Sequence, residues 1–416
     1  MRFRLLYSSV IGLLLIVGAG FCTRSAVYGQ TVDVKPALAK LHAVGAKGAG
    51  HRDAIAAMQM LSKAEPSQLP EVLTGLDGDC GPLAANWVRS AAESIAGKTI
   101  KNGGQLPVSA LEKFLSDTKH SPRARRLAYE LISSVDKTAE QRLIPGFLND
   151  PSLELRRDAV ALAIKAAEES EAGGDKKQTI ALYQTAFNAA RDVDQVKQTY
   201  DKLKNLGQTP DVARQMGFLL TWKLVGPFDN SGGKGFDTAY APEQGVDLSA
   251  VYDAKGTKAK WIEHTTDEPY GLVDLTKALD KHKGAIVYAF AEFIASDERD
   301  VELRLGSVNA NKVWLNGQLL TANAIYHAGR DIDQYSGKGR LKKGRNEILL
   351  KIAQNEQEEN WAQDWQFQLR VCDQIGTAML SLDRDAKKTA QLQRNFRKTM
   401  PTFLEVPSVV FVPFAR

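Results

Sequence analysis

The spacing of apolar residues changes once along the chain, near Gly207, and this change limits the folds open to it. Between Val34 and Gly207 the apolar residues recur at helical spacing, and Gly, Pro or Asp residues interrupt them at intervals. Beyond Gly207 the period becomes alternating, and five of the six tryptophans fall between 222 and 365. The sequence therefore predicts a multidomain α + β protein, with an all-helical half followed by a mostly β half.

The first residues have the features of an export signal. Two arginines precede an apolar run over 5–21, and Val27 and Gly29 supply the small residues that signal peptidase accepts. We expect residues 1–29 to be removed before Gln30, which leaves no membrane span. The mature protein would then be exported to the periplasm, the cell envelope or the extracellular space. A retained signal anchor stays open as the alternative.

Removal of this signal changes the charge balance. The whole chain has 54 Lys and Arg against 49 Asp and Glu, and the signal holds three of the arginines and no acid. The mature chain therefore has 51 basic and 49 acidic residues, a net charge of +2. This balance gives no support to nucleic acid as a partner, since such proteins usually carry a strongly basic surface.

Three segments of the helical half repeat one pattern. Each has an arginine followed three residues later by an alanine, and a shorter apolar helix precedes it. The arginines are Arg89, Arg125 and Arg156, spaced 36 and 31 residues apart. The third copy, with Pro151 fitting its first turn, resembles the second helix of HEAT repeats. The resemblance covers residues 65–170 and implies a HEAT-like α-solenoid in which these arginines are structural.

One further helical hairpin follows the linker at 171–175, with Tyr183 on its first helix and Tyr200 on its second. It resembles a tetratricopeptide hairpin. Stacked hairpins usually present an extended surface to another protein and rarely contribute catalytic groups. We therefore expect residues 30–214 to form a helical repeat domain that binds a protein partner.

The second half contains eight candidate strands. Alternating or continuous apolar runs predict them at 220–226, 259–264, 285–295, 300–305, 311–315, 318–321, 346–353 and 364–372. The pair Asn316–Gly317 tolerates the positive φ that a two-residue hairpin turn requires. We expect an antiparallel β-sandwich over 215–376, followed by a basic C-terminal arm over 377–416 that packs back on the helical domain. An arm that docks on a partner is the alternative.

Two sequence stretches of this half resemble a known domain. They are Val-Trp-Leu-Asn-Gly at 313–317 and Leu-Lys-Lys-Gly-Arg-Asn-Glu-Ile-Leu-Leu-Lys at 341–351. Together they resemble the jelly-roll sugar-binding domain of family 2 glycoside hydrolases and the wider galactose-binding-like superfamily. The resemblance implies a jelly roll that binds sugar, calcium or protein and often lacks catalytic residues. Joined to HEAT-like repeats, this domain resembles a family of exported bacterial proteins of unassigned function.

Three loops of the β half are rich in polar and aromatic residues, at 226–237, 326–335 and 354–364. The glycines of the first match neither a phosphate-binding nor a dinucleotide-binding fingerprint. The second suits a sugar, because aromatic faces stack on pyranose rings while Arg and Asp bind hydroxyls. In the third, Trp361 lies outside the alternating register of the strand that follows, so we expect its ring to be presented. The residues predicted to bind the ligand are Tyr326, His327, Arg330, Asp331, Asp333, Tyr335 and Trp361. A solvated loop with an internal Arg–Asp pair is the alternative for the second of them.

The sequence favours a non-enzymatic protein without a cofactor. It contains no HExxH, GxSxG or CxxC motif, which disfavours metalloproteases, serine hydrolases and thiol-redox enzymes. A calcium site at His327, Asp331 and Asp333 stays open as an alternative.

We therefore expect an exported binding or scaffold protein that recognises carbohydrate through its sandwich. Two alternatives stay open. One is a structural cell-envelope protein that makes only protein contacts. The other is a glycan hydrolase, since Asp331, Glu356, Glu358 and Glu359 could supply the two carboxylates that glycoside cleavage needs.

Overall fold

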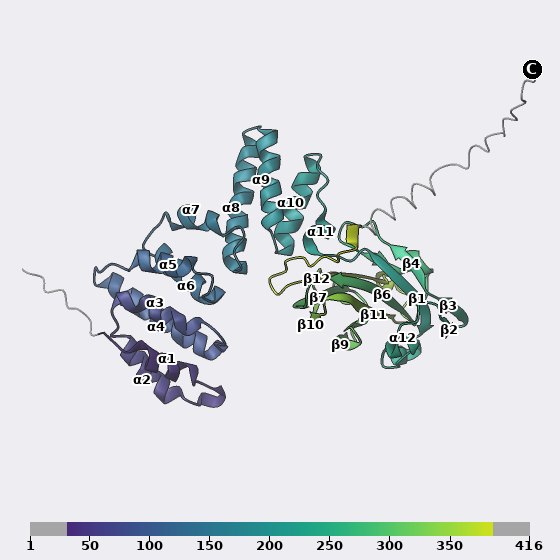
Figure 1. The fold of residues 1–416 in the computed structure, drawn as a ribbon, viewed down its shortest axis with the longest axis horizontal. Helices are drawn as coiled ribbons and strands as arrows, with labels where there is room; N and C mark the ends of the chain where they lie inside the picture. The colour runs from purple at the N-terminus through teal and green to yellow at the C-terminus, as the bar shows by residue number, and fades with distance from the viewer. Residues whose placement is uncertain (1–30, 386–416) are drawn as a thin grey trace, which may run out of the picture. The chain divides into compact units, whose positions relative to one another are not determined.

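The computed structural model describes residues 31–385, which belong to two units divided after Asp136. The predicted signal at 1–29 and the part of the predicted C-terminal arm beyond Asp385 lie outside the described residues. The first unit is helical, and the second contains further helices followed by antiparallel sheets (Figure 1). This order confirms the predicted α + β class.

The helices of the first unit pair along the chain, α1 with α2, α3 with α4 and α5 with α6. Proline begins both α4 and α6, where a missing N–H costs nothing. The α3–α4 and α5–α6 pairs confirm two of the predicted hairpins. The helices are α1 (Val34–His42), α2 (His51–Leu61), α3 (Leu69–Leu73), α4 (Pro82–Lys101), α5 (Val108–Ser116) and α6 (Pro122–Ser133), with short 3-10 turns at Ala46–Gly48, Pro66–Gln68 and Thr74–Leu76.

Arg125 shows what the repeated arginine does in this unit. Its side chain is 1% exposed, and its Nε donates a 2.6 Å hydrogen bond to the carbonyl of Leu115 at the end of α5. The guanidinium therefore ties the two helices of its hairpin together, which supports the structural role expected for it. Arg89 instead lies at the surface, paired with Glu93 and Glu130.

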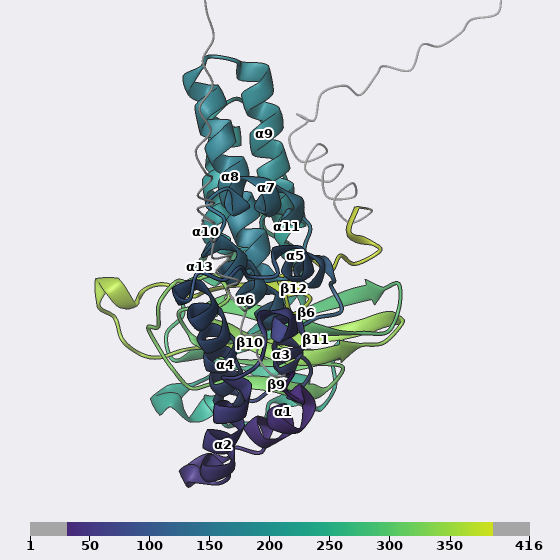
Figure 2. The ribbon, with the colours of Figure 1, turned by 90° about the vertical axis from the view of Figure 1, so that its left-hand side faces the viewer.

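The helices of the second unit form two further hairpins. Helix α8 packs against α9 and α9 against α10, side by side in both views (Figures 1 and 2). Their shared core also includes Phe218, and Tyr270 and Ile332 from the β half pack against it. These helices therefore belong to one structural body with the sheets. They are α7 (Ala139–Leu143), a 3-10 turn at Ile144–Phe147, α8 (Leu153–Ala172), α9 (Lys176–Ala189), α10 (Val193–Asn205) and α11 (Val212–Met216).

The β half contains a six-stranded sheet in the order β4-β1-β6-β11-β8-β9, a four-stranded sheet β10-β7-β12-β5 and a hairpin β2-β3, with antiparallel pairing throughout. Every predicted strand overlaps an observed one, whereas β2, β5 and β10 were not predicted. The strands are β1 (Thr221–Asp229), β2 (Val251–Ala254), β3 (Thr257–Lys260), β4 (Ile262–Thr265), β5 (Val273–Asp274), β6 (Ala285–Ala295), β7 (Arg299–Ser307), β8 (Ala310–Leu315), β9 (Gln318–Asn323), β10 (Tyr335–Leu341), β11 (Gly344–Gln354) and β12 (Gln366–Cys372). Short helices lie at Ser231–Phe236, Ala241–Gln244 (α12), Leu275–Leu279 (α13) and Asn360–Ala362.

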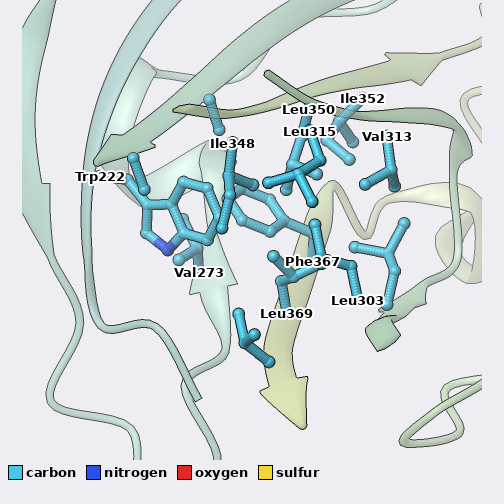
Figure 3. Close-up of a cluster of buried hydrophobic side chains, with 14 of the residues drawn as sticks. Trp222, Val273, Leu303, Val313, Leu315, Ile348, Leu350, Ile352, Phe367 and Leu369 are labelled. Carbon is cyan, nitrogen blue, oxygen red and sulfur yellow. The ribbon is translucent and has the colours of Figure 1, made fainter. Parts of the chain in front are cut away.

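The main core of the β half lies between the two larger sheets. Leu350 from the six-stranded sheet meets Leu303 and Phe367 from the four-stranded sheet, and Trp222 packs edge-on against Phe367 at 5.1 Å (Figure 3). A second core covers the outer face of the six-stranded sheet. There Tyr288 of β6 packs with side chains of the 228–261 segment. Burial on both faces explains why β6 is apolar along most of its length.

Candidate functional site

Three polar loops leave the same end of the six-stranded sheet. Strands β1, β11 and β9 end at Asp229, Gln354 and Asn323. Asp229 and Gln354 both pair with Ala285 of β6, and Asn323 pairs with Asn311 of β8, in antiparallel registers. In an antiparallel sheet alternate strands run in the same direction, so the loops that follow these three strands lie at the same end of the sheet. We call the side chains of loops 226–237, 326–335 and 354–364 at this end of the sheet the three-loop site. The sequence had identified the three loops but not their common location.

Hydrogen bonds join the three loops to one another. The Nδ2 of Asn230 donates to the Tyr326 hydroxyl and to the carbonyl of Gln354, each at 3.0 Å. The backbone N–H of Gly232 donates to Glu356 Oε2 at 3.1 Å. Asn230 is fully buried, so its amide is a fixed anchor beneath the loops rather than a mobile surface group.

Trp361 is the most prominent side chain of the three-loop site. Trp361 is 61% exposed, whereas the other five tryptophans are buried or half-buried. His327 meets the indole edge-on, with ring centroids 4.9 Å apart, and its Nε2 lies 3.0 Å from Asn355 Oδ1. The backbone of His327 has φ 56°, a left-handed conformation that is uncommon for a residue with a side chain. An apolar ring is thus held open to solvent between polar groups.

An ion pair also joins the second loop to the third. Arg330, whose side chain is 68% exposed, forms an ion pair with Asp364 from the third loop. The exposed Asp331 follows it directly in the sequence. The exposed guanidinium of Arg330 can donate to a polar ligand, and the exposed carboxylate of Asp331 can accept from it.

Two of the predicted ligand residues do not join the site. Tyr335 begins strand β10 and packs against the inter-sheet core, where burial raises the pKa of its hydroxyl. Asp333 binds Arg370 through both carboxylate oxygens, with Nε to Oδ1 at 2.6 Å, and Arg304 Nη1 at 3.2 Å. Tyr326, His327, Arg330 and Trp361 therefore interact at the three-loop site with Asp331 beside them, while Asp333 and Tyr335 have structural positions.

The role of Asp333 follows from the register of the four-stranded sheet. Arg304 of β7 and Arg370 of β12 are directly opposite each other, and their neighbours Leu303 and Leu369 point into the core. Both arginines therefore lie on the outer face, where like charges at opposite positions destabilise a sheet. Asp333 lies between them and neutralises the repulsion, with the Arg370 side chain only 1% exposed.

The alternative of a calcium site at His327, Asp331 and Asp333 does not agree with this geometry. His327 faces Asn355, whereas the arginines of the four-stranded sheet hold the carboxylate of Asp333. Within residues 31–385, no group of three His, Cys, Asp or Glu side chains is arranged to hold a metal ion.

Sequence reasoning did not select Asn230, Asn355 or Asp364 as site residues, although each contacts a predicted one. Asn230 and Asn355 directly follow strands β1 and β11. An asparagine just past a strand end is the signal that would have indicated them, because its side-chain amide can satisfy backbone groups where the strand pairing stops.

Comparisons with known proteins give only partial and distant likenesses. No protein family and no curated protein matches the chain. Among solved structures, it is similar to a β-glucosidase from Kluyveromyces marxianus in complex with glucose, at 16% identity over 26% of this chain and 13% of that one, with a TM-score of 0.18. A β-glucuronidase from an uncultured Clostridium species is 14% identical over 38% of this chain and 29% of that one, with a TM-score of 0.21.

A third solved structure, the GH31 α-xylosidase from Xanthomonas citri, is 16% identical over 27% of this chain and 15% of that one, with a TM-score of 0.15. The chain thus spans less than a third of the length of each of these three glycoside hydrolases. TM-scores of this size do not establish a common fold. Separately, none of the helices within residues 31–385 has the length and apolar character needed to cross a membrane.

Proposed function

We propose that this protein is an exported, non-enzymatic binding protein whose β half recognises carbohydrate at the three-loop site. The observation that carries the proposal is the exposed indole of Trp361, set against His327 where three polar loops meet. A flat apolar ring bordered by hydrogen-bonding groups suits a pyranose, which has an apolar face and a rim of hydroxyls. In this proposal the two larger sheets form a jelly roll of the galactose-binding-like type.

The helical half has a separate role in this proposal. Its hairpins would form a HEAT-like solenoid that binds a protein partner, because stacked hairpins offer an extended surface. A pocket of about 320 Å³ between α4 and α6 supports a binding role for the first unit. It is lined by Leu76, Pro82, Ala85, Asn86, Arg89, Arg123 and Leu127.

The variant Trp361→Ala is expected to weaken glycan binding about 30-fold, the effect of losing a contact worth about 2 kcal/mol. The experiment screens the protein against bacterial and algal polysaccharides by affinity electrophoresis and then measures the affinity for any retained glycan by calorimetry. Leu319→Ala is the matched control, since Leu319 is 48% exposed on β9 of the same sheet and lies outside the three-loop site. The control should bind as the wild type does.

Three results would count against the proposal. Equal affinity of the wild type and Trp361→Ala would remove the three-loop site from recognition. A wild type that retains no polysaccharide would favour the structural cell-envelope protein that makes only protein contacts. Release of reducing ends during the same screen would show a glycan hydrolase, and substitution of Asp331, Glu356, Glu358 and Glu359 would then identify its carboxylates.

A further inference from the structure

The pocket between α4 and α6 combines an apolar floor with a basic rim. Its floor consists of buried apolar side chains, which are Leu76, Ala85 and Leu127. Its charged lining residues are Arg89 and Arg123, and no acid of the described first unit belongs to the lining. A ligand that matches this pocket therefore brings an apolar group together with a negative charge.

The two arginines of the rim differ in their partners. Arg89 forms ion pairs with Glu93 at 2.8 Å and with Glu130 at 2.5 Å, so its charge is already neutralised. Arg123 is exposed, and its Nη1 donates a 3.2 Å hydrogen bond to the neutral carbonyl of Cys80. Among residues 31–385, no carboxylate lies within ion-pair distance of Arg123. Its remaining N–H groups are thus available to an anionic ligand.

The acids nearest to this end of the pocket are not part of it. Asp77 accepts a 2.7 Å hydrogen bond from the backbone N–H of Ser121, and its other oxygen lies 2.7 Å from His120 Nδ1. Asp79 is exposed and, within the described residues, forms no ion pair with Arg123. Neither acid lines the pocket, so neither occupies the place of a ligand carboxylate.

The pocket is held in shape where α6 begins. The hydroxyl of Ser121 donates to the carbonyl of Leu76 at 2.7 Å and accepts from the backbone N–H of Ala124 at 3.2 Å. The start of α6 is therefore fastened to the turn that carries Leu76. Helices α4 and α6 begin at Pro82 and Pro122, so the positive ends of both helix dipoles lie beside the pocket and add to the charge of Arg123.

We propose that this pocket binds an extended acidic segment of a protein partner, with an aliphatic side chain on the apolar floor and a neighbouring carboxylate paired with Arg123. The ligand is a protein segment because the helical half is proposed to bind a protein, a role on which this inference rests. The volume of about 320 Å³ suits one side chain rather than a whole helix. The exposed amide of Asn86 can bind the backbone of such a segment. A carboxylate suits the single unpaired guanidinium better than a phosphate, which carries nearly two charges.

The first experiment uses the wild-type protein and two matched sets of blocked hexapeptides. Each peptide of one set contains a single leucine and a single glutamate one to three residues apart, and the other set has glutamine in place of glutamate. Binding is followed by methyl NMR of the full protein with labelled leucines, because Leu76 and Leu127 line the pocket and report its occupancy. The best glutamate peptide should shift both residues and bind about three- to tenfold more tightly than its glutamine counterpart.

The variant Arg123→Gln should lose this preference and bind the two matched peptides alike. Arg123 is exposed, so the substitution is expected to leave the fold of the first unit intact. Arg52→Gln is the matched control, since Arg52 is an exposed arginine on α2 outside the pocket, and it should keep the preference. Neither variant should change glycan affinity, because both lie outside the β half.

The outcomes separate this inference from the role on which it rests. Equal binding of the glutamate and glutamine peptides by the wild type would overturn the acidic partner and leave an apolar protein-binding pocket. A preference for glutamate that persists in Arg123→Gln would overturn the assignment of Arg123. If neither set shifts Leu76 and Leu127, the pocket does not bind such segments, and the proposed protein-binding role loses its support as well.

Discussion

Replacing Asp333 with Ala is expected to lower the free energy of unfolding of the second unit by about 3–5 kcal/mol, the usual cost of removing one partner from a buried ion pair. The substitution leaves Arg304 and Arg370 opposite each other with no shared carboxylate, and the Arg370 side chain is 1% exposed. Water can solvate neither charge fully. Urea denaturation followed by tryptophan fluorescence measures the loss, because five tryptophans lie in this unit.

Asp331→Ala is the control for this prediction. Asp331 belongs to the same loop but is exposed, and its removal should change the free energy of unfolding by no more than about 0.5 kcal/mol. A similar, small loss for both variants would show that Asp333 does not neutralise the arginine pair. A large loss for Asp331→Ala alone would contradict the assignment of the two residues to different roles.

Replacing Lys351 with Met is also expected to lower the free energy of unfolding of the second unit by about 3–5 kcal/mol. Lys351 is fully buried on β11 and donates to the carbonyls of Phe236 and Thr238 and to Glu243 Oε1, at 2.7 to 2.9 Å. The variant would leave the carboxylate of Glu243 buried, with the Tyr288 hydroxyl as its remaining donor. The same urea titration measures the effect.

A double variant separates the charge from the packing. In Lys351→Met with Glu243→Gln both charges of the pair are absent, so we expect it to recover most of the stability that the single variant loses. Lys338→Met, at an exposed position of β10, should be close to neutral. The interpretation would be wrong if the double variant were less stable than Lys351→Met, because the loss would then come from packing alone.

The observed strands follow the predicted ones where local patterns are strong and depart from them where the pattern is absent. Strand β10 reads Tyr-Ser-Gly-Lys-Gly-Arg-Leu over 335–341 and has no alternation of apolar residues. The fold explains why Gly337 has no side chain: a Cβ at this position would lie 2.7 Å from the Leu320 side chain. Because β10 was missed, Tyr335 was interpreted as a loop residue.

Local sequence patterns also could not predict ion pairs between residues that are far apart in the sequence. Arg370 and Asp333 are 37 residues apart, and nothing near either one in the sequence indicates the other. Lys351 alternates with apolar residues of β11 and has the pattern of a solvent-facing residue, yet the segment after β1 covers it. The three-loop site depends on sheet order in the same way, since only the order β1-β6-β11-β8-β9 brings its loops together.

The facing arginines also constrain how the protein folds. Pairing of β7 with β12 brings two positive charges together, and the carboxylate that relieves the repulsion comes from a loop that is distant in sequence. The β7–β12 pairing and the loop that carries Asp333 therefore stabilise each other, so we expect them to fold and unfold in one cooperative transition. His327 and Arg330 lie on that loop, so the chain cannot complete its four-stranded sheet at full strength without also ordering part of the three-loop site.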